Sequence, residues 1–481
     1  MSNTHQGKKI MTTSVKALAT VVAFTLAGMA NAQATPVGVA QGLDADERVL
    51  VHAKGMAAED AFMVLGALTV KGRLMRDSEL GHEGYRPDLS EDPMQSVGQT
   101  WLELLDTVHG RLVDDGRIRA HAGGDDEAAP EVYADAAYLY HMHHSAGRFE
   151  HLGLYDELTH TPSPLISILT SHVVNERHAD GVMHAANGSE ADGFAYGLDA
   201  LHAATYAWVR QDKPGGAEDM GKMERAALEG WLGHSREDLV EVARAMAEAA
   251  EAAWDAEAGI YQLDQGAEWS LDQIGAMLRG HKALYEMLYL YGDSADAERA
   301  ATLADRAAAI AGAVMAGHGP MRDWGLPARL KFEDGNARAA ADYVDTAAQW
   351  RFVHQLTGGF SLLREREGTA GLIGERTPEL EGQVGRAIDR LLLGALDYQL
   401  EDGTIPAALS YADGRVIDPR VTTRSVAAFV QAVGNGYRIG EAFDRPGAWE
   451  EGSPLAERSR ALYDAFLGHG ELLTERLILR E

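Results

Sequence analysis

The stretch EWSLDQIGAMLRGHKALYEMLYLYG, residues 268–292, predicts the element around which the rest of the chain is organised. Ser270 is a typical N-cap residue and Gly292 follows the last apolar side chains, so a helix is predicted between them. Its leucine, isoleucine and tyrosine side chains surround most of the cylinder, which is typical of a helix buried on several sides. Asp272 lies in its first turn, where the helix dipole favours a carboxylate.

A unit built on this helix recurs along the chain: a short extended segment, a buried helix and an amphipathic covering helix. Buried helices are predicted at residues 57–74, 131–146, 193–210, 270–291, 339–363 and 421–442. Covering helices are predicted at residues 95–113, 164–176, 218–254 with a break near Gly233, 296–316, 378–400 and 455–467, and a short last helix at 471–479. Short extended segments with a nearby turn residue are predicted at 178–185, 258–263, 327–332 and 402–409. No segment is long enough for a central strand, so the predicted class is all-α, with long loops and short β-hairpins on one face.

Several short stretches add a family likeness to this pattern: residues 259–261, Trp269, Asp272, 280–284, 290–293 and the alanine-rich segment 295–311. Together with six helical pairs, they resemble the (α/α)6 toroid, or six-hairpin, superfamily. That superfamily includes unsaturated glucuronyl hydrolases, other glycosidases, polysaccharide lyases and N-acylglucosamine epimerases. The resemblance implies one closed double ring over residues 33–481 and a carbohydrate-active enzyme. The competing all-α arrangement is an open solenoid of helix pairs.

The first 32 residues have the layout of a secretory signal peptide. Three lysines precede an apolar run at residues 17–27, and the small residues Ala30 and Ala32 follow it. The alternative is a membrane anchor, for which this apolar run is short. We therefore expect cleavage after Ala32, a periplasmic or secreted protein, and no membrane span in the mature chain.

The composition limits the partners. The formal net charge is −30, and the chain has no cysteine. Such acidity argues against nucleic acid or an anionic membrane surface as a partner. Without cysteine the chain can form neither disulfides nor thiolate metal sites. The expected ligand is a small molecule or an oligosaccharide, and the sequence does not indicate an oligomeric state.

Aspartates near the starts of predicted buried helices are the candidate catalytic residues. They are Asp199, Asp272 and Asp345, each close to an aromatic residue, which is Tyr196, Trp269 and Tyr343 respectively. In a closed ring the helix starts would converge, and paired carboxyl groups there could cleave a glycosidic bond while the aromatic rings stack on sugars. The alternative is a purely structural role, because aspartate in a first turn also caps backbone amides.

Arginines and a tryptophan complete the candidate substrate site. Arg279 lies seven residues after Asp272, on nearly the same helical face, and could line a cavity or form a buried ion pair. Arg420 and Arg424 begin the sixth buried helix, where guanidinium groups could bind a uronic acid or close the ring through salt bridges. Trp324 is a candidate stacking surface, although buried aromatic side chains also simply fill space.

Histidines provide the one candidate metal site. His141 and His144 lie three residues apart on one helical face, a spacing compatible with a shared divalent cation. No cofactor is predicted otherwise. The leading hypothesis is a periplasmic glycoside hydrolase or lyase that acts on an acidic glycan. The alternatives are a non-catalytic binding protein, with or without a metal at these histidines, and a helical scaffold.

Overall fold

A computed structural model describes residues 35–79, 91–114, 117–144, 181–183, 188–212, 235–315, 319–359, 377–436 and 454–481. The chain divides into two units, the first formed by Pro36–Leu479 and the second by the remaining residues at its two ends. The helices and the site discussed below belong to the first unit. The predicted signal peptide at residues 1–32 and the predicted covering helix at 164–176 lie outside the described residues, so both stay predictions.

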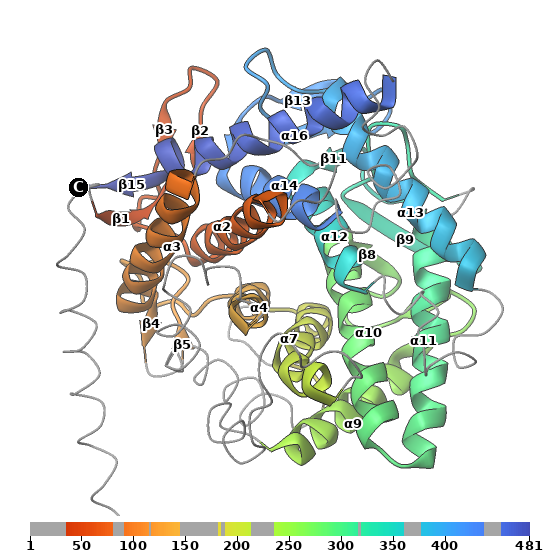
Figure 1. The fold of residues 1–481 in the computed structure, drawn as a ribbon. Helices are drawn as coiled ribbons and strands as arrows, with labels where there is room; N and C mark the ends of the chain where they lie inside the picture. The colour runs from red at the N-terminus through yellow and green to blue at the C-terminus, as the bar shows by residue number, and fades with distance from the viewer. Residues whose placement is uncertain are drawn as a thin grey trace, which may run out of the picture. The chain divides into compact units, whose positions relative to one another are not determined.

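Six helices of the first unit form a closed inner ring (Figure 1). Each contacts the next in the order α2 (Ala58–Glu79), α4 (Pro130–His144), α7 (Glu190–Asp212), α10 (Leu271–Tyr291), α12 (Thr346–Gly359) and α14 (Thr423–Gly436). The last of them, α14, packs against the first, α2. The described helices therefore close on themselves, which confirms the predicted toroid and contradicts the open solenoid.

Covering helices lie outside this ring in Figure 1. They are α3 (Glu91–Leu112) against α2, α9 (Arg236–Ala253) against α7 and α10, α11 (Ser294–Met315) against α10, α13 (Thr377–Gly394) against α11 and α14, and α16 (Pro454–Leu472) against α14. Each covers an apolar face that the inner ring would otherwise expose to water. Within the described residues, no helix combines the length and the apolar character needed to cross a lipid bilayer.

Helix α10 is buried along most of its length, as its sequence predicts. Ser270 caps its first turn in a capping box. Two glycines let neighbouring backbones approach closely: a Cβ on Gly280 would lie 2.3 Å from Cβ of Leu198 on α7, and one on Gly275 would lie 3.0 Å from Cα of Phe352 on α12. Larger residues at these positions would push the inner helices apart.

Short strands lead directly into three inner helices. They are β8 (Glu268–Ser270) before α10, β11 (Tyr343–Asp345) before α12 and β14 (Val421–Thr422) before α14. They belong to three-stranded sheets with the orders β10 (Asn336–Ala339)–β9 (Arg329–Glu333)–β8, β11–β12 (Ala408–Ser410)–β13 (Val416–Asp418) and β14–β2 (Gly42–Leu43)–β3 (Val49–Leu50). The other described strands are β1 (Pro36–Val39), β4 (Val113–Asp114), β5 (Arg117–Ile118), β6 (Trp254–Asp255), β7 (Ile260–Tyr261) and β15 (Ile478–Arg480).

The predicted helix boundaries fail where such strands intervene. Helix α12 begins at Thr346 rather than at residue 339, because Tyr343–Asp345 pairs with β12. Helix α14 begins at Thr423 rather than at residue 421, because Val421–Thr422 pairs with β2. The separate last helix at 471–479 is wrong, since α16 continues to Leu472 and a single π-helical turn, Leu473–Leu477, leads into β15.

Candidate active site

One end of the inner ring gathers polar side chains from all six inner helices, each within the first two turns. They are Glu59 of α2, Glu131 of α4, Tyr196 of α7, Asp272 of α10, Arg351 of α12 and Arg424 of α14. With Asp345, the residue just before α12, we call these seven residues the ring-end cluster. Because successive inner helices start at the same end of the ring, side chains far apart in sequence meet there.

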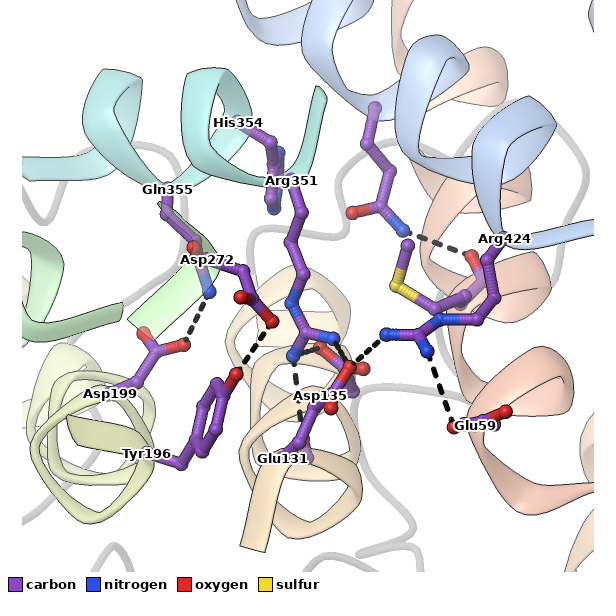
Figure 2. Close-up of polar contacts among 12 residues, drawn as sticks. Glu59, Glu131, Asp135, Tyr196, Asp199, Asp272, Arg351, His354, Gln355 and Arg424 are labelled. Carbon is purple, nitrogen blue, oxygen red and sulfur yellow. Dashed lines mark hydrogen bonds and ion pairs between the residues drawn. The ribbon is translucent and has the colours of Figure 1, made fainter. Parts of the chain in front are cut away.

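Two arginines in this cluster share one carboxylate (Figure 2). Arg351 and Arg424 both donate hydrogen bonds to Oε1 of Glu131. Arg351 also donates to Oδ1 of Asp135 at 2.8 Å, and Arg424 donates to Oε2 of Glu59 at 3.4 Å. Helices α12 and α4 lie on opposite sides of the ring, so the bond from Arg351 to Glu131 spans it. The arginines thus link α12 and α14 to α2 and α4 through charge-assisted hydrogen bonds.

Asp272 lies at the same ring end, half-buried, in the second position of α10. Its Oδ2 accepts a hydrogen bond from the Tyr196 hydroxyl at 2.6 Å, and its Oδ1 accepts one from the Ser270 hydroxyl at 2.8 Å. Burial acts to raise the pKa of Asp272, but the positive charge of Arg351 and these two hydroxyl donors outweigh it and hold the pKa below its usual value. Asp272 is therefore ionised over the physiological pH range.

Asp345 has the opposite electrostatic environment. It ends β11, is half-buried, and accepts a hydrogen bond from the backbone N–H of Ala348 at 3.1 Å, so it also caps α12. Burial raises its pKa above the usual value, and the negative charge of Asp272 adds to that effect, while the Ala348 N–H and Arg424 oppose it. Two carboxyl groups at the starts of adjacent helices thus have pKa values shifted in opposite directions.

Asp135 lies one turn deeper in α4 than Glu131 and is almost completely buried. Burial raises its pKa to about 7. The positive charge of Arg351 opposes this shift, and the negative charges of Glu131 and Asp199 add to it. Its Oδ2 has no hydrogen-bond partner in the described part of the chain. A proton on this carboxyl reduces the excess of negative charge around the two arginines.

The deeper part of the ring holds a separate ion pair, and it corrects two predicted roles. Asp199 accepts two hydrogen bonds from the guanidinium of Arg279, from Nε and from Nη2, and a third from Gln355 at 3.3 Å. The side chains of Arg279 and Asp199 are only 3% and 0% exposed. Asp199 is therefore no accessible catalytic carboxylate, and Arg279 binds Asp199 rather than Asp272 or a substrate. His354 and the ring of Tyr138 enclose the guanidinium.

Four other predicted substrate-binding residues differ in their surroundings. Trp269 is fully buried and donates to the backbone oxygen of Tyr261, so a stacking role for it is wrong. Trp324 is half-buried and donates to the backbone oxygen of Tyr411. Arg420 is exposed and bonds to Asp418 two residues away, outside the ring-end cluster. Tyr343 is 38% exposed and lies two residues before Asp345 in β11, on the same side of the strand.

The predicted metal site stays a prediction. His141 and His144 belong to α4, but their side chains lie outside the described part of the structure. Among the side chains that are described, no group of three or more histidine or acidic residues is arranged to hold a metal ion. Two described histidines of the inner ring make contacts within the protein: His281 bonds to the Tyr261 hydroxyl, and His354 contacts Arg279.

Sequence patterns alone did not predict a role for Arg351, Glu131 or Glu59. The physical cause for Arg351 is specific: with α12 predicted from residue 339, Arg351 lay far from the helix start, whereas it is in the second turn of the true helix. Glu131 and Glu59 are each the second residue of an inner helix. Both would have emerged from a search for charged residues of either sign, and not aspartates alone, in the first two turns.

Comparison with known proteins adds little to this geometry. No family model and no curated protein sequence matches the chain. Among solved structures, a sugar epimerase from a ruminal bacterium is similar with 10% identity and a TM-score of 0.44, over 82% of this chain and 91% of that one. A possible GH105 family member from Klebsiella pneumoniae has 13% identity and a TM-score of 0.44, over 90% and 96%. A GH15 glucoamylase from Hypocrea jecorina has 11% identity and a TM-score of 0.44, over 84% and 66%. Likeness at this level carries no inference about chemistry.

Proposed function

We propose that this chain is a carbohydrate-active enzyme that cleaves glycosidic bonds with Asp345 and Asp272. The observation that carries the proposal is the pair of half-buried carboxyl groups whose pKa values are shifted in opposite directions. Glycoside cleavage needs one carboxyl group that keeps its proton and one that stays ionised. The two groups lie at the starts of adjacent helices and interact electrostatically, as an acid–base pair must.

The two groups then have distinct roles. Asp345 donates its proton to the glycosidic oxygen as the bond from that oxygen to the anomeric carbon breaks. Asp272 either attacks the anomeric carbon or removes a proton from the attacking water, and the net reaction adds water across the bond. The Tyr196 and Ser270 hydroxyl groups orient Asp272 and favour its ionised form. Whether the product retains or inverts its configuration follows from the separation of the carboxyl groups in the substrate complex.

The substrate side of the proposal depends on Tyr343 and Arg424. Tyr343 is exposed beside Asp345 and offers a ring on which a sugar can stack. The side chain of Arg424 is 31% exposed, and its contact with Glu59 is long at 3.4 Å. A partly exposed guanidinium can bind a substrate carboxylate, which supports an acidic glycan as the substrate. A periplasmic location remains part of the proposal, and N-terminal sequencing of the exported protein would check cleavage after Ala32.

A substrate screen with three variants tests the proposal. Neutral and uronic-acid oligosaccharides are incubated with the wild type, Asp272→Asn, Asp345→Asn and, as a control, Asp418→Asn in the exposed pair with Arg420. We expect kcat/KM for a cleaved glycan to fall about 10²–10⁴-fold in the first two variants and to stay unchanged in the control. The wild-type profile should be bell-shaped, with activity lost at low pH as Asp272 is protonated and at high pH as Asp345 is deprotonated.

Several outcomes separate this proposal from its alternatives. Full activity in both aspartate variants would remove the proposed acid–base pair. An unsaturated uronate product, detected by its ultraviolet absorbance, would identify a lyase instead of a hydrolase. Glycan binding without turnover by the wild type would support the non-catalytic binding protein.

A further inference from the structure

Glu131 has an unusual position within the ring-end cluster. A single one of its oxygens, Oε1, accepts hydrogen bonds from guanidinium groups on two different inner helices, α12 and α14. Two convergent guanidinium groups form the arrangement with which proteins bind a carboxylate or sulfate group of a ligand. In this chain a side chain of the protein occupies that position (Figure 2).

We propose that Glu131 determines specificity by occupying the position where Arg351 and Arg424 would otherwise bind the anionic group of a sugar. An anionic sugar then reaches the two arginines only by displacing the Glu131 carboxylate. The proposal rests on the proposed function, since it names how that same site selects between charged and neutral sugars. It assigns Glu131 no part in bond cleavage.

The contacts of the two arginines make such displacement feasible. When Glu131 moves away, Arg351 keeps its 2.8 Å bond to Asp135 and Arg424 keeps its contact with Glu59. Each guanidinium therefore keeps a carboxyl oxygen as a hydrogen-bond acceptor. The ligand anion supplies the negative charge that Glu131 provided, so no buried charge is left unpaired. The pair formed by Asp199 and Arg279 differs: Asp199 binds that guanidinium with both oxygens, and its other described neighbours are His354 and the ring of Tyr138 rather than a second carboxylate.

Exposure also favours Glu131 as the group that moves. Its side chain is 17% exposed and that of Arg424 is 31% exposed, whereas Arg351 is only 2% exposed. An anion approaching from solvent therefore meets Glu131 and Arg424 first, and reaches Arg351 only after Glu131 has left. Displacement of one carboxylate by another also leaves the number of charge-assisted hydrogen bonds unchanged.

Binding measurements test this without relying on catalysis. Isothermal titration at low ionic strength compares a glucuronate-containing disaccharide with its neutral glucose counterpart, on the wild type, Glu131→Gln and Glu59→Gln. The second variant is the matched control: it removes the same charge next to Arg424, but from a side chain that is 41% exposed and lies 3.4 Å from that guanidinium. Thermal melting of each variant establishes that it is folded.

We expect Glu131→Gln to bind the glucuronate disaccharide at least about tenfold more tightly than the wild type, a gain of about 1.4 kcal/mol. Its affinity for the neutral disaccharide should stay the same, and Glu59→Gln should gain less than about threefold, as removal of an exposed charge does. No gain in Glu131→Gln, an equal gain in Glu59→Gln, or an equal gain for the neutral sugar would each overturn the proposal. If Glu131→Gln does not fold, Glu131→Asp replaces it, because the shorter carboxylate is withdrawn from the arginines and the same selective gain is expected.

The outcome is independent of the catalytic assay. A selective gain in binding together with an inactive wild type would retain Glu131 as the specificity residue and reject glycoside cleavage. Conversely, an active wild type in which Glu131→Gln shows no selective gain would reject only the role of Glu131.

Discussion

Two arginine–carboxylate arrangements inside the same ring illustrate how depth decides the role of a charged residue. The pair formed by Asp199 and Arg279 joins adjacent helices α7 and α10, is closed by two parallel hydrogen bonds, and is almost completely buried. The ring-end cluster is built from the same residue types, but its arginines share carboxylates and its outer members reach solvent. The candidate chemistry therefore lies at the helix starts, while similar residues farther along the helices hold the ring together.

The physical reason lies in the position of each residue along its helix. Asp272 is the second residue of α10, whereas Asp199 is the tenth residue of α7. Farther along the helices the side chains of Arg279 and Asp199 are almost completely shielded from water, so a charge there must be fully paired. At the ring end, partial exposure allows a carboxyl group to exchange a proton or meet a ligand.

The largest effect on stability is expected from breaking the buried ion pair of Asp199 and Arg279. Arg279→Met leaves Asp199 as an uncompensated buried charge, which should cost about 3–5 kcal/mol of unfolding free energy. Urea denaturation followed by circular dichroism measures the loss. A cost below about 1 kcal/mol would show that the buried position of this pair does not make it important for the stability of the ring.

An intermediate effect is expected at Asp135, which connects the two regions. Its pKa is raised from 3.8 to about 7 in the folded chain, so the folded state binds its proton more tightly than the unfolded state does. That contribution to stability is fully present below about pH 4 and is lost as the pH rises through 7, by at most about 4 kcal/mol. In Asp135→Asn this loss should disappear.

The measurement for Asp135 is the difference in unfolding free energy between the wild type and Asp135→Asn from pH 4 to pH 7. His281 and His469, whose pKa values burial lowers to about 4, contribute a change of opposite sign. They do so equally in both proteins and cancel in the difference. A difference that does not vary with pH would contradict the raised pKa.

The smallest effect on stability is expected at the ion pair of Arg420 and Asp418, which is more exposed than the pair of Arg279 and Asp199. Asp418→Asn should change the unfolding free energy by less than about 1 kcal/mol, and less still in high salt. The same urea denaturation applies. A loss as large as that of Arg279→Met would mean that exposure does not decide the contribution of such pairs in this chain.

Much of the fold could be predicted from the sequence, because helix-forming patterns and caps are local. Ser270, Gly292 and the apolar residues between them define α10 without reference to the rest of the chain. Strand boundaries were harder to predict. Whether Tyr343–Asp345 extends α12 or forms a strand depends on its partner, β12, which lies more than sixty residues later in the chain. The prediction of Asp272 as a first-turn carboxylate followed from local rules, and its hydrogen bond with Tyr196 did not.

By itself, the sequence determined the helices, their caps, the acidic composition and the recurring pair of buried and covering helices. Only the tertiary structure decided that the ring closes, that Asp199 binds Arg279, and that Arg351 and Arg424 meet Glu131 across 220 and 293 residues of chain. The reason is that helix formation depends on neighbours within a few residues, whereas burial, pKa shifts and ion pairing depend on which helix starts the closed ring brings together.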